Sequence, residues 1–324
     1  MLNPGLYVHS AGFIAPAAIP AEAVLRLSAS EPDYAGIIPP MQLRRMSKAV
    51  RMGIGAAHAC LQEAGLLVPD AIVVGTTMGC LQDTEVFLKK LVTQEERMLT
   101  PTAFIQSTHN TVAGQIALVT GCHGCNTTIS QHGHSFEGAV MSAALYLGET
   151  PRHTVLCGAV DELTDTSFHL HQRAGVYASE AYAPDAPGSE AHGAIAGEGA
   201  GFLLLNKEST GAKALIAGLL VFSEKDISKA LLQIQDCLTD GKAIPDTDAL
   251  WFGVSGDISH DAVYQEFQQS WNGDTVLFKA QTGEWGTAIA PAICRAITHW
   301  PEGKDRIWIV NHYARDWSLW LLTR

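Results

Sequence analysis

The segment from Phe136 to Leu147 constrains the fold most strongly, because nearly all of its side chains are small or apolar. A helix that is apolar on every side cannot lie on a protein surface and must be covered all round. We therefore expect this helix to lie between two sheets. The remainder of the chain must supply those sheets, which favours a layered α/β architecture.

Short apolar runs bounded by Gly or polar residues predict central strands that are buried on both faces. They lie at 71–75, 154–158, 201–205, 214–217, 249–253 and 306–310. Segments with helical spacing of apolar residues alternate with these runs, at 47–65, 136–147, 227–237 and 288–300. A stretch rich in Ala, Pro, Gly and acidic residues at 181–192 is predicted to be a surface loop.

The charge, the apolar runs and the cysteines of the chain argue against nucleic-acid binding, a membrane span and a metal site. The formal net charge is -12, which argues against binding to a nucleic-acid backbone. No run of about 20 apolar residues predicts a membrane span, and the start of the chain has no basic region followed by a long apolar run, so we expect a cytoplasmic protein. The 7 cysteines lie mostly in apolar runs. Cys122 and Cys125 form a C-x-x-C pair without a second ligand pair, so no metal and no cofactor are predicted.

Several motifs, in this order and spacing along the chain, together resemble the β-ketoacyl synthases of fatty-acid and polyketide synthesis. The segment at 99–117 resembles the stretch before the nucleophile of that family, and Gly133 and Gly138 match glycines of the helix that follows it. The other matching stretches are 154–162, the Gly-rich 193–205, the Lys279-Ala-Gln-Thr-Gly283 motif, and Asn311 after the last predicted strand.

This resemblance implies an α/β thiolase fold, with two pseudo-duplicated halves in five layers (αβαβα). The first half would comprise residues 1–206, and a shortened second half would comprise residues 207–324. The resemblance also implies a dimer in which the strand at 124–129 pairs with the same strand of the partner across a two-fold axis.

The nucleophile of an active ketosynthase is a thiolate at the start of a buried helix, where the helix N-terminus lowers the thiol pKa. By the resemblance, this position falls on Ser130, and a shift of one residue would place Gln131 there. A serine hydroxyl needs a neighbouring base to attack a carbonyl carbon, and a glutamine cannot attack it at all. Neither residue supplies the thiol of an active member.

The two catalytic histidines of the family fall on Ser255 and Glu284. An ionised carboxylate at the second position cannot donate a hydrogen bond to a developing enolate. The Gly-rich loop near the C-terminus of the family is replaced by the bulky segment 311–318, which contains no Gly. Because every catalytic position is exchanged while the surrounding motifs remain, we predict no independent condensing activity and no catalytic residue.

Ser130 also allows an alternative, an acyltransferase or hydrolase in which Ser130 is the nucleophile. On a helix, Ser130 and His134 would share a face, and Glu137 could orient the imidazole. A Gly-x-Ser-x-Gly elbow is absent, and side chains of one helix lean the same way, which is poor geometry for proton abstraction. The competing interpretation is that Ser130 caps the helix, while His132 and His134 line an interface or pocket.

The resemblance predicts a chain-length-factor-type subunit. Such a subunit forms a heterodimer with an active ketosynthase, reaches the acyl carrier protein through that partner, and shapes the acyl tunnel in polyketide, aryl-polyene or fatty-acid-type biosynthesis. The residues that correspond to the cross-dimer pocket of the family are Phe104, Ile105, Gln106, His109 and Asn110.

Overall fold

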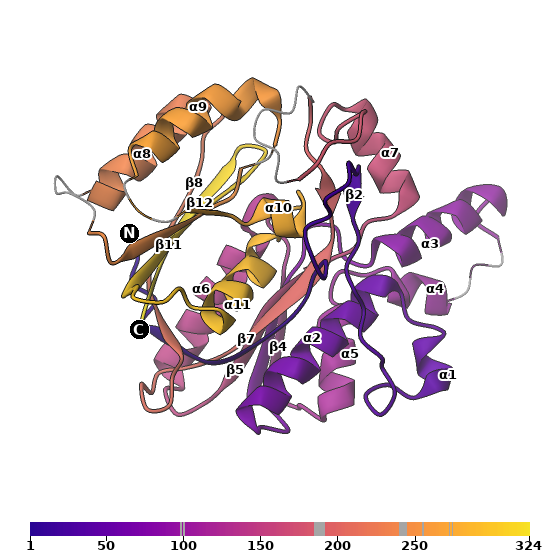
Figure 1. Cartoon of the computed structure of the whole chain (residues 1–324). Helices are drawn as coiled ribbons and strands as arrows, with labels where there is room; N and C mark the ends of the chain where they lie inside the picture. The colour runs from indigo at the N-terminus through magenta and orange to yellow at the C-terminus, as the bar shows by residue number, and fades with distance from the viewer. Residues whose placement is uncertain are drawn as a thin grey trace.

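The computed structural model describes residues 1–97, 99, 101–184, 192–239, 245–254, 256–271, 273 and 275–324. Its main feature is a mixed sheet with the strand order β10-β9-β11-β12-β8-β1-β7-β5-β3-β4 (Figure 1). One run of five neighbouring strands comprises β1 (Leu6–Ile14), β7 (Gly199–Asn206), β5 (Val155–Asp161), β3 (Ala71–Gly75) and β4 (Cys125–Ile129). The other run comprises β8 (Ala214–Ser223), β12 (Asp316–Thr323), β11 (Arg306–Tyr313), β9 (Asp248–Phe252) and β10 (Thr275–Leu277).

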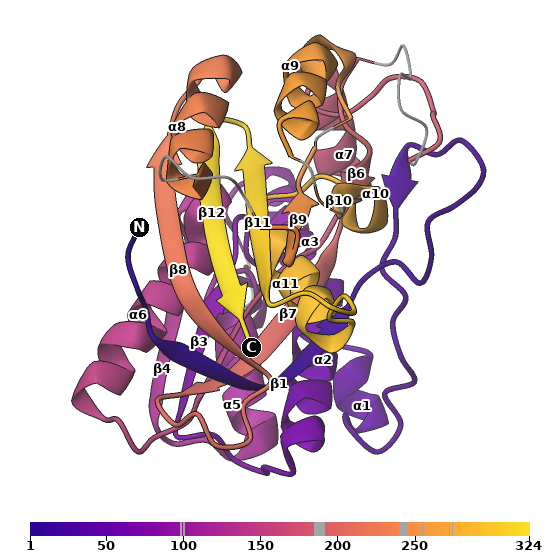
Figure 2. The same cartoon turned by 60° about the vertical axis from the view of Figure 1, so that its left-hand side comes forward.

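The two five-stranded runs have the same topology. In the first, β7 is antiparallel to both β1 and β5, and β3 is parallel to both β5 and β4. In the second, β12 is antiparallel to β8 and β11, and β9 is parallel to β11 and β10. Figure 2 shows the second run side by side in this order. The duplication of the fold is therefore confirmed. A short antiparallel pairing, Leu6–Val8 of β1 with Ala214–Ile216 of β8, joins the two runs.

The helices form three layers around these strands. The middle layer is α6 (Ser135–Glu149) and α11 (Ile289–Thr298), which share one core with both runs. The first outer layer is α2 (Lys48–Ala64) and α5 (Thr111–Thr120), and the second is α8 (Ile227–Thr239) and α9 (Ile258–Gln269). The remaining elements are α1 (Pro40–Leu43), α3 (Leu81–Thr93), α4 (Pro101–Gln106), the 3-10 turn η1 (His132–His134), α7 (Asp165–Arg173), α10 (Lys279–Thr282), β2 (Arg26–Leu27) and β6 (Ala196–Gly197).

The alternation of side chains along each central strand produces these layers, because successive residues of a strand point to opposite faces. In β3, Val73 faces the middle layer, whereas Ile72 and Val74 pack with the first outer layer. In β9, Trp251 faces the middle layer, whereas Leu250 packs with the second outer layer. Strands that are apolar on both faces thus hold helices on both sides, and the predicted five-layer arrangement is confirmed.

The predicted central helix is largely buried, but one side of it reaches the surface. Phe136, Ala143 and Leu147 of α6 are completely buried. Leu145 of the same helix is 76% exposed. The expectation that this helix is covered all round is therefore wrong for one turn near its C-terminal end, because α6 packs beside β4, the edge strand of the sheet.

The C-terminal segment 311–318 differs from the predicted loop, and Asn311 does not follow the last strand. Asn311 lies within β11, which continues to Tyr313, and β12 begins at Asp316. The two residues between them form a tight turn in which Ala314 has a left-handed backbone, with φ 55°. The segment pairs as a hairpin because its bulky and charged side chains find buried partners, as shown below for Asp316.

In the described part of the chain, no helix is both long and apolar enough to cross a bilayer.

Glycines let the middle layer approach the strands closely. A Cβ atom on Gly201 of β7 would lie 2.5 Å from the backbone of Ala290 and Pro291 in α11. A Cβ atom on Gly75 of β3 would lie 2.5 Å from the carbonyl oxygen of Ser135. These distances are far below van der Waals contact, and both neighbours are backbone atoms that cannot rotate away.

We expect Gly201→Ala to destabilise the protein by about 1–3 kcal/mol, because the added methyl group must push α11 away from β7. The matched control is Gly148→Ala in α6, where a Cβ atom meets no atom within 4 Å. That change should be neutral or stabilise by up to about 1 kcal/mol through helix propensity. Chemical denaturation measures both variants, and equal stabilities for the two would contradict the close approach of α11 and β7.

Candidate functional site

The turn between β4 and α6 lies where the sequence places the degenerate nucleophile position. Ser130 and Gln131 follow β4, η1 begins at His132, and α6 begins only at Ser135. His132 has a left-handed backbone, with φ 54°, which is unfavourable for a residue with a side chain. Strain of this kind persists only where surrounding contacts hold it.

Ser130 neither caps α6 nor shares a helical face with His134, so both of those expectations are wrong. Ser130 is exposed, and its hydroxyl donates a long hydrogen bond, 3.4 Å, to the carbonyl oxygen of Thr77. His134 Nε2 lies 3.2 Å from the carbonyl oxygen of Trp317, which requires this nitrogen to be the donor. The irregular turn before α6 places the two side chains against different partners, so the geometry does not favour a Ser–His nucleophile.

Asp316 holds this turn from the neighbouring strand β12. One carboxylate oxygen lies 2.8 Å from His132 Nδ1 and accepts a hydrogen bond from the Gly133 N–H at 3.1 Å. The other oxygen accepts from the Ser223 hydroxyl at 2.9 Å. Burial alone would raise the pKa of Asp316, but the hydrogen bonds from His132 and Ser223 outweigh it and leave this pKa lowered. Asp316 is therefore an ionised, nearly buried anchor for the left-handed His132.

Asp161, at the end of β5, ties together the loops of the two halves. Its Oδ1 accepts from the Thr76 hydroxyl at 2.8 Å and from the N–H groups of Thr77 and Met78 at 2.8 and 3.1 Å. Its Oδ2 accepts from the Thr287 hydroxyl, just before α11, at 2.7 Å. Burial raises the pKa of Asp161, and these donors oppose that effect. Since a carboxylate with several donated hydrogen bonds is strongly stabilised, we assign the ionised form.

Glu284, which the sequence predicts at the second catalytic histidine position, forms a buried ion pair. Lys279 Nζ lies 2.8 Å from a carboxylate oxygen of Glu284, and both side chains are almost completely buried. Lys279 also donates to the carbonyl oxygen of His312. Burial lowers the pKa of Lys279 and raises that of Glu284, while the opposite charge of each partner counteracts both shifts. Glu284 is therefore engaged with Lys279 and presents no hydrogen-bond donor.

His312 is a neutral, structural imidazole. Burial lowers the pKa of His312 to about 3. Its Nε2 faces the carbonyl oxygen of Ala314 and must carry the proton, so its Nδ1 accepts from the Tyr264 hydroxyl at 2.7 Å. The ring stacks on Trp317 with centroids 4.0 Å apart. With both ring nitrogens bonded, His312 cannot replace a catalytic histidine.

Tyr313 is buried near the carboxylates described above. Burial raises the pKa of Tyr313, and the nearby charges of Glu284, Asp161 and Asp316 raise it further. The Tyr313 ring also lies 5.1 Å from the ring of His132. Tyr313 and Asp316 could not be recognised from the sequence, because only the hairpin brings the segment 311–318 over the start of α6.

Glu137 of α6 is a further acid with an unusual environment, in the middle layer. It is completely buried, one oxygen accepts from the Ser318 hydroxyl at 2.6 Å, and the other has no hydrogen-bond partner among the residues that the structure describes. Burial raises the pKa of Glu137. The Glu137 carboxylate bonds to Ser318, and His134 bonds to the Trp317 carbonyl oxygen, so no hydrogen bond in the described part of the chain shows Glu137 orienting the His134 imidazole as the predicted Ser–His arrangement requires.

The residues predicted for a cross-dimer pocket lie on α4 and at the start of α5. Phe104 and Ile105 are 57% and 63% exposed, and the Phe104 ring lies 5.6 Å from that of Phe87. His109 packs over Gly79, in the loop that follows β3, and Asn110 directly precedes α5. The loop under His109 also reaches the turn before α6, because Thr77 of that loop hydrogen-bonds to Ser130 and His132, whereas the exposed Phe104 and Ile105 form a surface.

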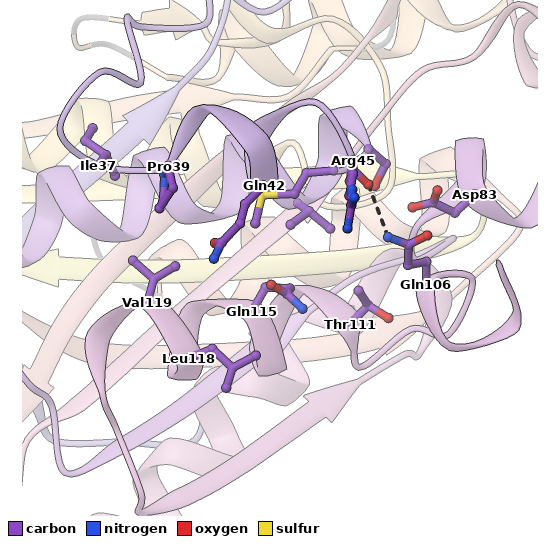
Figure 3. Close-up of a pocket in the computed structure, with 13 residues that line it drawn as sticks. Ile37, Pro39, Gln42, Arg45, Asp83, Gln106, Thr111, Gln115, Leu118 and Val119 are labelled. Atoms are coloured by element: carbon purple, nitrogen blue, oxygen red, sulfur yellow. Dashed lines mark hydrogen bonds between the residues drawn. The ribbon is translucent and has the colours of Figure 1, made fainter. Parts of the chain in front are cut away.

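Gln106 faces a groove of about 630 Å³ on the first outer layer (Figure 3). Gln42 of α1 and Gln115 of α5 lie on opposite sides of this groove, and Gln106 donates a hydrogen bond to the carbonyl oxygen of Arg45 at 3.1 Å. The other lining residues are Ile37, Pro39, Met46, Ser47, Val50, Asp83, Thr111, Leu118 and Val119.

The strand β4 is an edge strand with a free side. The Thr76 N–H donates to the Ile129 carbonyl oxygen, so Ile129 turns its peptide groups toward β3. Because the peptide groups of successive residues point to alternate sides of a strand, the N–H and C=O groups of Asn126 and Thr128 point away from β3. Leu145 of α6, the helix that packs beside β4, is an exposed apolar side chain. The free edge offers peptide groups with which another strand could pair.

Two further predictions concern Ser255 and metal binding. Ser255, the predicted first histidine position, lies outside the described residues. Within the part of the chain that the structure describes, no group of three or more His, Cys, Asp or Glu side chains is placed to hold a metal ion.

Comparison with known sequences supports the resemblance. The family profile described as the β-ketoacyl synthase N-terminal domain matches residues 20–197, which is more than half of the chain. No curated protein sequence was found to match.

Comparison with solved structures shows the thiolase fold of ketosynthases. A β-ketoacyl synthase from Burkholderia phymatum STM815 has a TM-score of 0.78 and 14% identity, with 100% of both chains covered. The ishigamide ketosynthase/chain length factor has a TM-score of 0.76 and 16% identity, with 98% of both chains covered. The ketosynthase ApeO in complex with its chain length factor ApeC, from Xenorhabdus doucetiae, has a TM-score of 0.71 and 14% identity, again covering 98% of both chains.

We expect Lys279→Met to destabilise the protein by about 3–5 kcal/mol, because it leaves the Glu284 carboxylate buried without a counter-charge. The double variant Lys279→Met/Glu284→Leu should recover most of this loss, since it removes both charges. Urea denaturation of the two variants measures the difference.

The control is Lys229→Met, which removes a lysine from an exposed pair with Asp226. It should change stability by less than about 1 kcal/mol. If the double variant were as unstable as Lys279→Met alone, the ion pair would not be the reason for the loss.

Proposed function

Because this chain belongs to the β-ketoacyl synthase family, we propose that it acts as a non-condensing, chain-length-factor-type subunit of an active ketosynthase. One observation carries the proposal. The turn between β4 and α6, where a ketosynthase needs a thiolate, holds Ser130, Gln131 and His132, and the His132 ring is bound to Asp316. The residues at this turn include no thiol, and the His132 imidazole is engaged by a carboxylate of the protein itself.

The cysteines elsewhere do not supply the missing nucleophile. Burial raises the pKa of both Cys60 and Cys80 to about 12, and it raises the pKa of Cys157 and Cys294 as well. A thiol in such surroundings stays protonated and unreactive at neutral pH. Cys125 is exposed, but it lies at the start of β4, away from the helix start that activates the thiolate in the family.

Glu284 supports the same proposal from the other side of the site. An active ketosynthase needs a hydrogen-bond donor there for the enolate that forms when the malonyl group loses CO2. Glu284 instead brings a negative charge that Lys279 neutralises. Glu284 is bound to Lys279 and His312 is bonded at both ring nitrogens, so neither residue offers a free imidazole for that step.

The partner would be an active ketosynthase that pairs with the free edge of β4. The outward peptide groups of Asn126 and Thr128 need hydrogen-bond partners, and the exposed Leu145 of α6, which packs beside β4, needs cover from water. Similar proteins include complexes of a ketosynthase with its chain length factor. We expect the acyl carrier protein to engage the pair through the ketosynthase.

In this pair, the chain would limit how far the acyl product can grow. Phe104 and Ile105 are large apolar side chains that α4 presents to the surface, where a partner subunit would bury them. Side chains of this size at the end of an apolar tunnel set its length by filling space. Such a subunit suits polyketide biosynthesis, including that of aryl polyenes.

Reconstitution tests the proposed partnership. The isolated chain should neither condense nor decarboxylate malonyl groups and should not bind an acyl carrier protein, whereas it should co-purify with its ketosynthase and support product formation. Thr128→Pro should abolish co-purification, because proline removes an outward N–H while leaving the bonds of β4 to β3 in place.

The matched control is Thr128→Val, which keeps the N–H group and the shape of the side chain. Circular dichroism should show that both variants fold. Turnover by the isolated chain at the rate of an active ketosynthase would refute the proposed function, and co-purification of Thr128→Pro at the level of Thr128→Val would refute the pairing through β4.

Phe104→Ala in the reconstituted pair should shift products toward longer chains, because it removes apolar volume from the proposed tunnel. Mass spectrometry of the products measures the shift. Leu232→Ala is the control, since Leu232 is 61% exposed on α8 in the opposite outer layer. Identical product lengths for Phe104→Ala and the unmodified pair would exclude Phe104 from the tunnel.

A further inference from the structure

A second groove lies on the other side of the molecule, where the middle layer opens to solvent beside the edge strand β10. Its volume is about 530 Å³, a size typical of small-molecule sites. Apolar side chains from three strands line it: Phe13 and Ile14 from β1, Trp251 from β9, and Val276 from β10. Arg295 of α11 also lines the groove, together with the polar side chains of Ser30, Gln281 and His299. We call it the Arg295 groove.

Arg295 has no anionic partner in the described part of the chain. Its guanidinium donates to Gln281 Oε1 at 2.6 Å and to the carbonyl oxygen of Pro16 at 3.3 Å, and both acceptors are neutral. Burial lowers the pKa of Arg295, and no neighbouring charge counteracts the shift. A guanidinium has five N–H donors, so donors remain free after these two bonds.

Other partly buried arginines of the chain are paired with a carboxylate. Arg26 is bound to Asp165 and Arg51 to Glu31, with arginine side chains that are 31% and 26% exposed. Arg306 is bound to Asp248. At these three positions, a carboxylate of the protein neutralises a partly buried guanidinium. Arg295 has no such carboxylate among the described residues.

The position of Arg295 in the last turn of α11 offsets only part of the free-energy cost of burying its charge. The C-terminal end of a helix attracts a cation weakly. Taking the charge partly out of water opposes this attraction. The Phe13 ring adds a weak attraction, with the guanidinium carbon 5.4 Å from the ring centroid. The part of the burial cost that these two attractions do not offset favours the binding of an anion from outside the chain.

We propose that the Arg295 groove binds a small carboxylic acid with an aliphatic or aromatic tail. The free donors of Arg295 take the carboxylate, and the walls formed by Phe13, Ile14, Trp251 and Val276 cover the tail. A single guanidinium beside apolar walls suits a singly charged carboxylate better than a phosphate. This site is separate from the turn at His132 and from the edge of β4, so it does not depend on the proposed function.

Calorimetric titration of the full chain with octanoate and with octanol tests the site. Octanoate should bind with a dissociation constant of about 1 mM or lower and roughly tenfold more tightly than octanol, which is the effect of about 1.4 kcal/mol from the charge. This comparison uses the unmodified protein and does not depend on the folding of any variant.

Arg295→Gln should weaken octanoate binding about tenfold and leave octanol binding unchanged, because it removes the charge but keeps a polar side chain. The matched control is Arg152→Gln, which removes an exposed arginine elsewhere and should leave both affinities unchanged. Equal binding of octanoate and octanol, or an octanoate affinity that Arg295→Gln does not alter, would overturn the proposal. So would the absence of octanoate binding at concentrations that saturate a millimolar site.

Discussion

The structure depends on one packing constraint: α6 and α11 fill the space between two sheets, at distances that leave no room for a methyl group on the facing glycines. Gly201 admits the backbone of α11 and Gly75 admits the start of α6. Interiors packed to this density transmit small displacements instead of absorbing them. The positions of the loops that enter these two helices, and hence the geometry of the site, are therefore fixed by the middle layer.

Each middle-layer helix is preceded by residues that bind a buried carboxylate from the opposite half. Asp316 of the second run of strands accepts from Gly133 and contacts His132, just before α6. Asp161 of the first run accepts from Thr287, just before α11. Anions are favoured near helix N-termini, where the backbone dipoles leave a partial positive charge. The two acids thus connect the halves reciprocally and stabilise both helix starts.

The sequence was sufficient to predict the layers and most central strands, because apolar runs and helical periodicity are local signals. It was insufficient for the turn before α6. Ser130 was expected at a helix start, but the left-handed His132 and η1 delay the helix to Ser135, and that conformation depends on Asp316, 184 residues away from His132. The hairpin at 311–318 was missed for the same reason. Its bulky and charged residues resemble a loop until their buried partners are known.

A structural subunit and a catalyst differ in whether the polar groups of the site are already bonded within the protein. A catalytic site keeps nucleophiles, acids and donors free for a substrate and stores strain for that purpose. Here the left-handed backbone remains at His132, but Asp316 holds both the imidazole and the next N–H, and Lys279 neutralises Glu284. His132 and Glu284 are therefore bonded to groups of the protein itself instead of remaining open to a substrate. Internal bonding of this kind fits a rigid subunit whose contribution is its shape, because a partner surface must keep its form without help from a bound acyl chain.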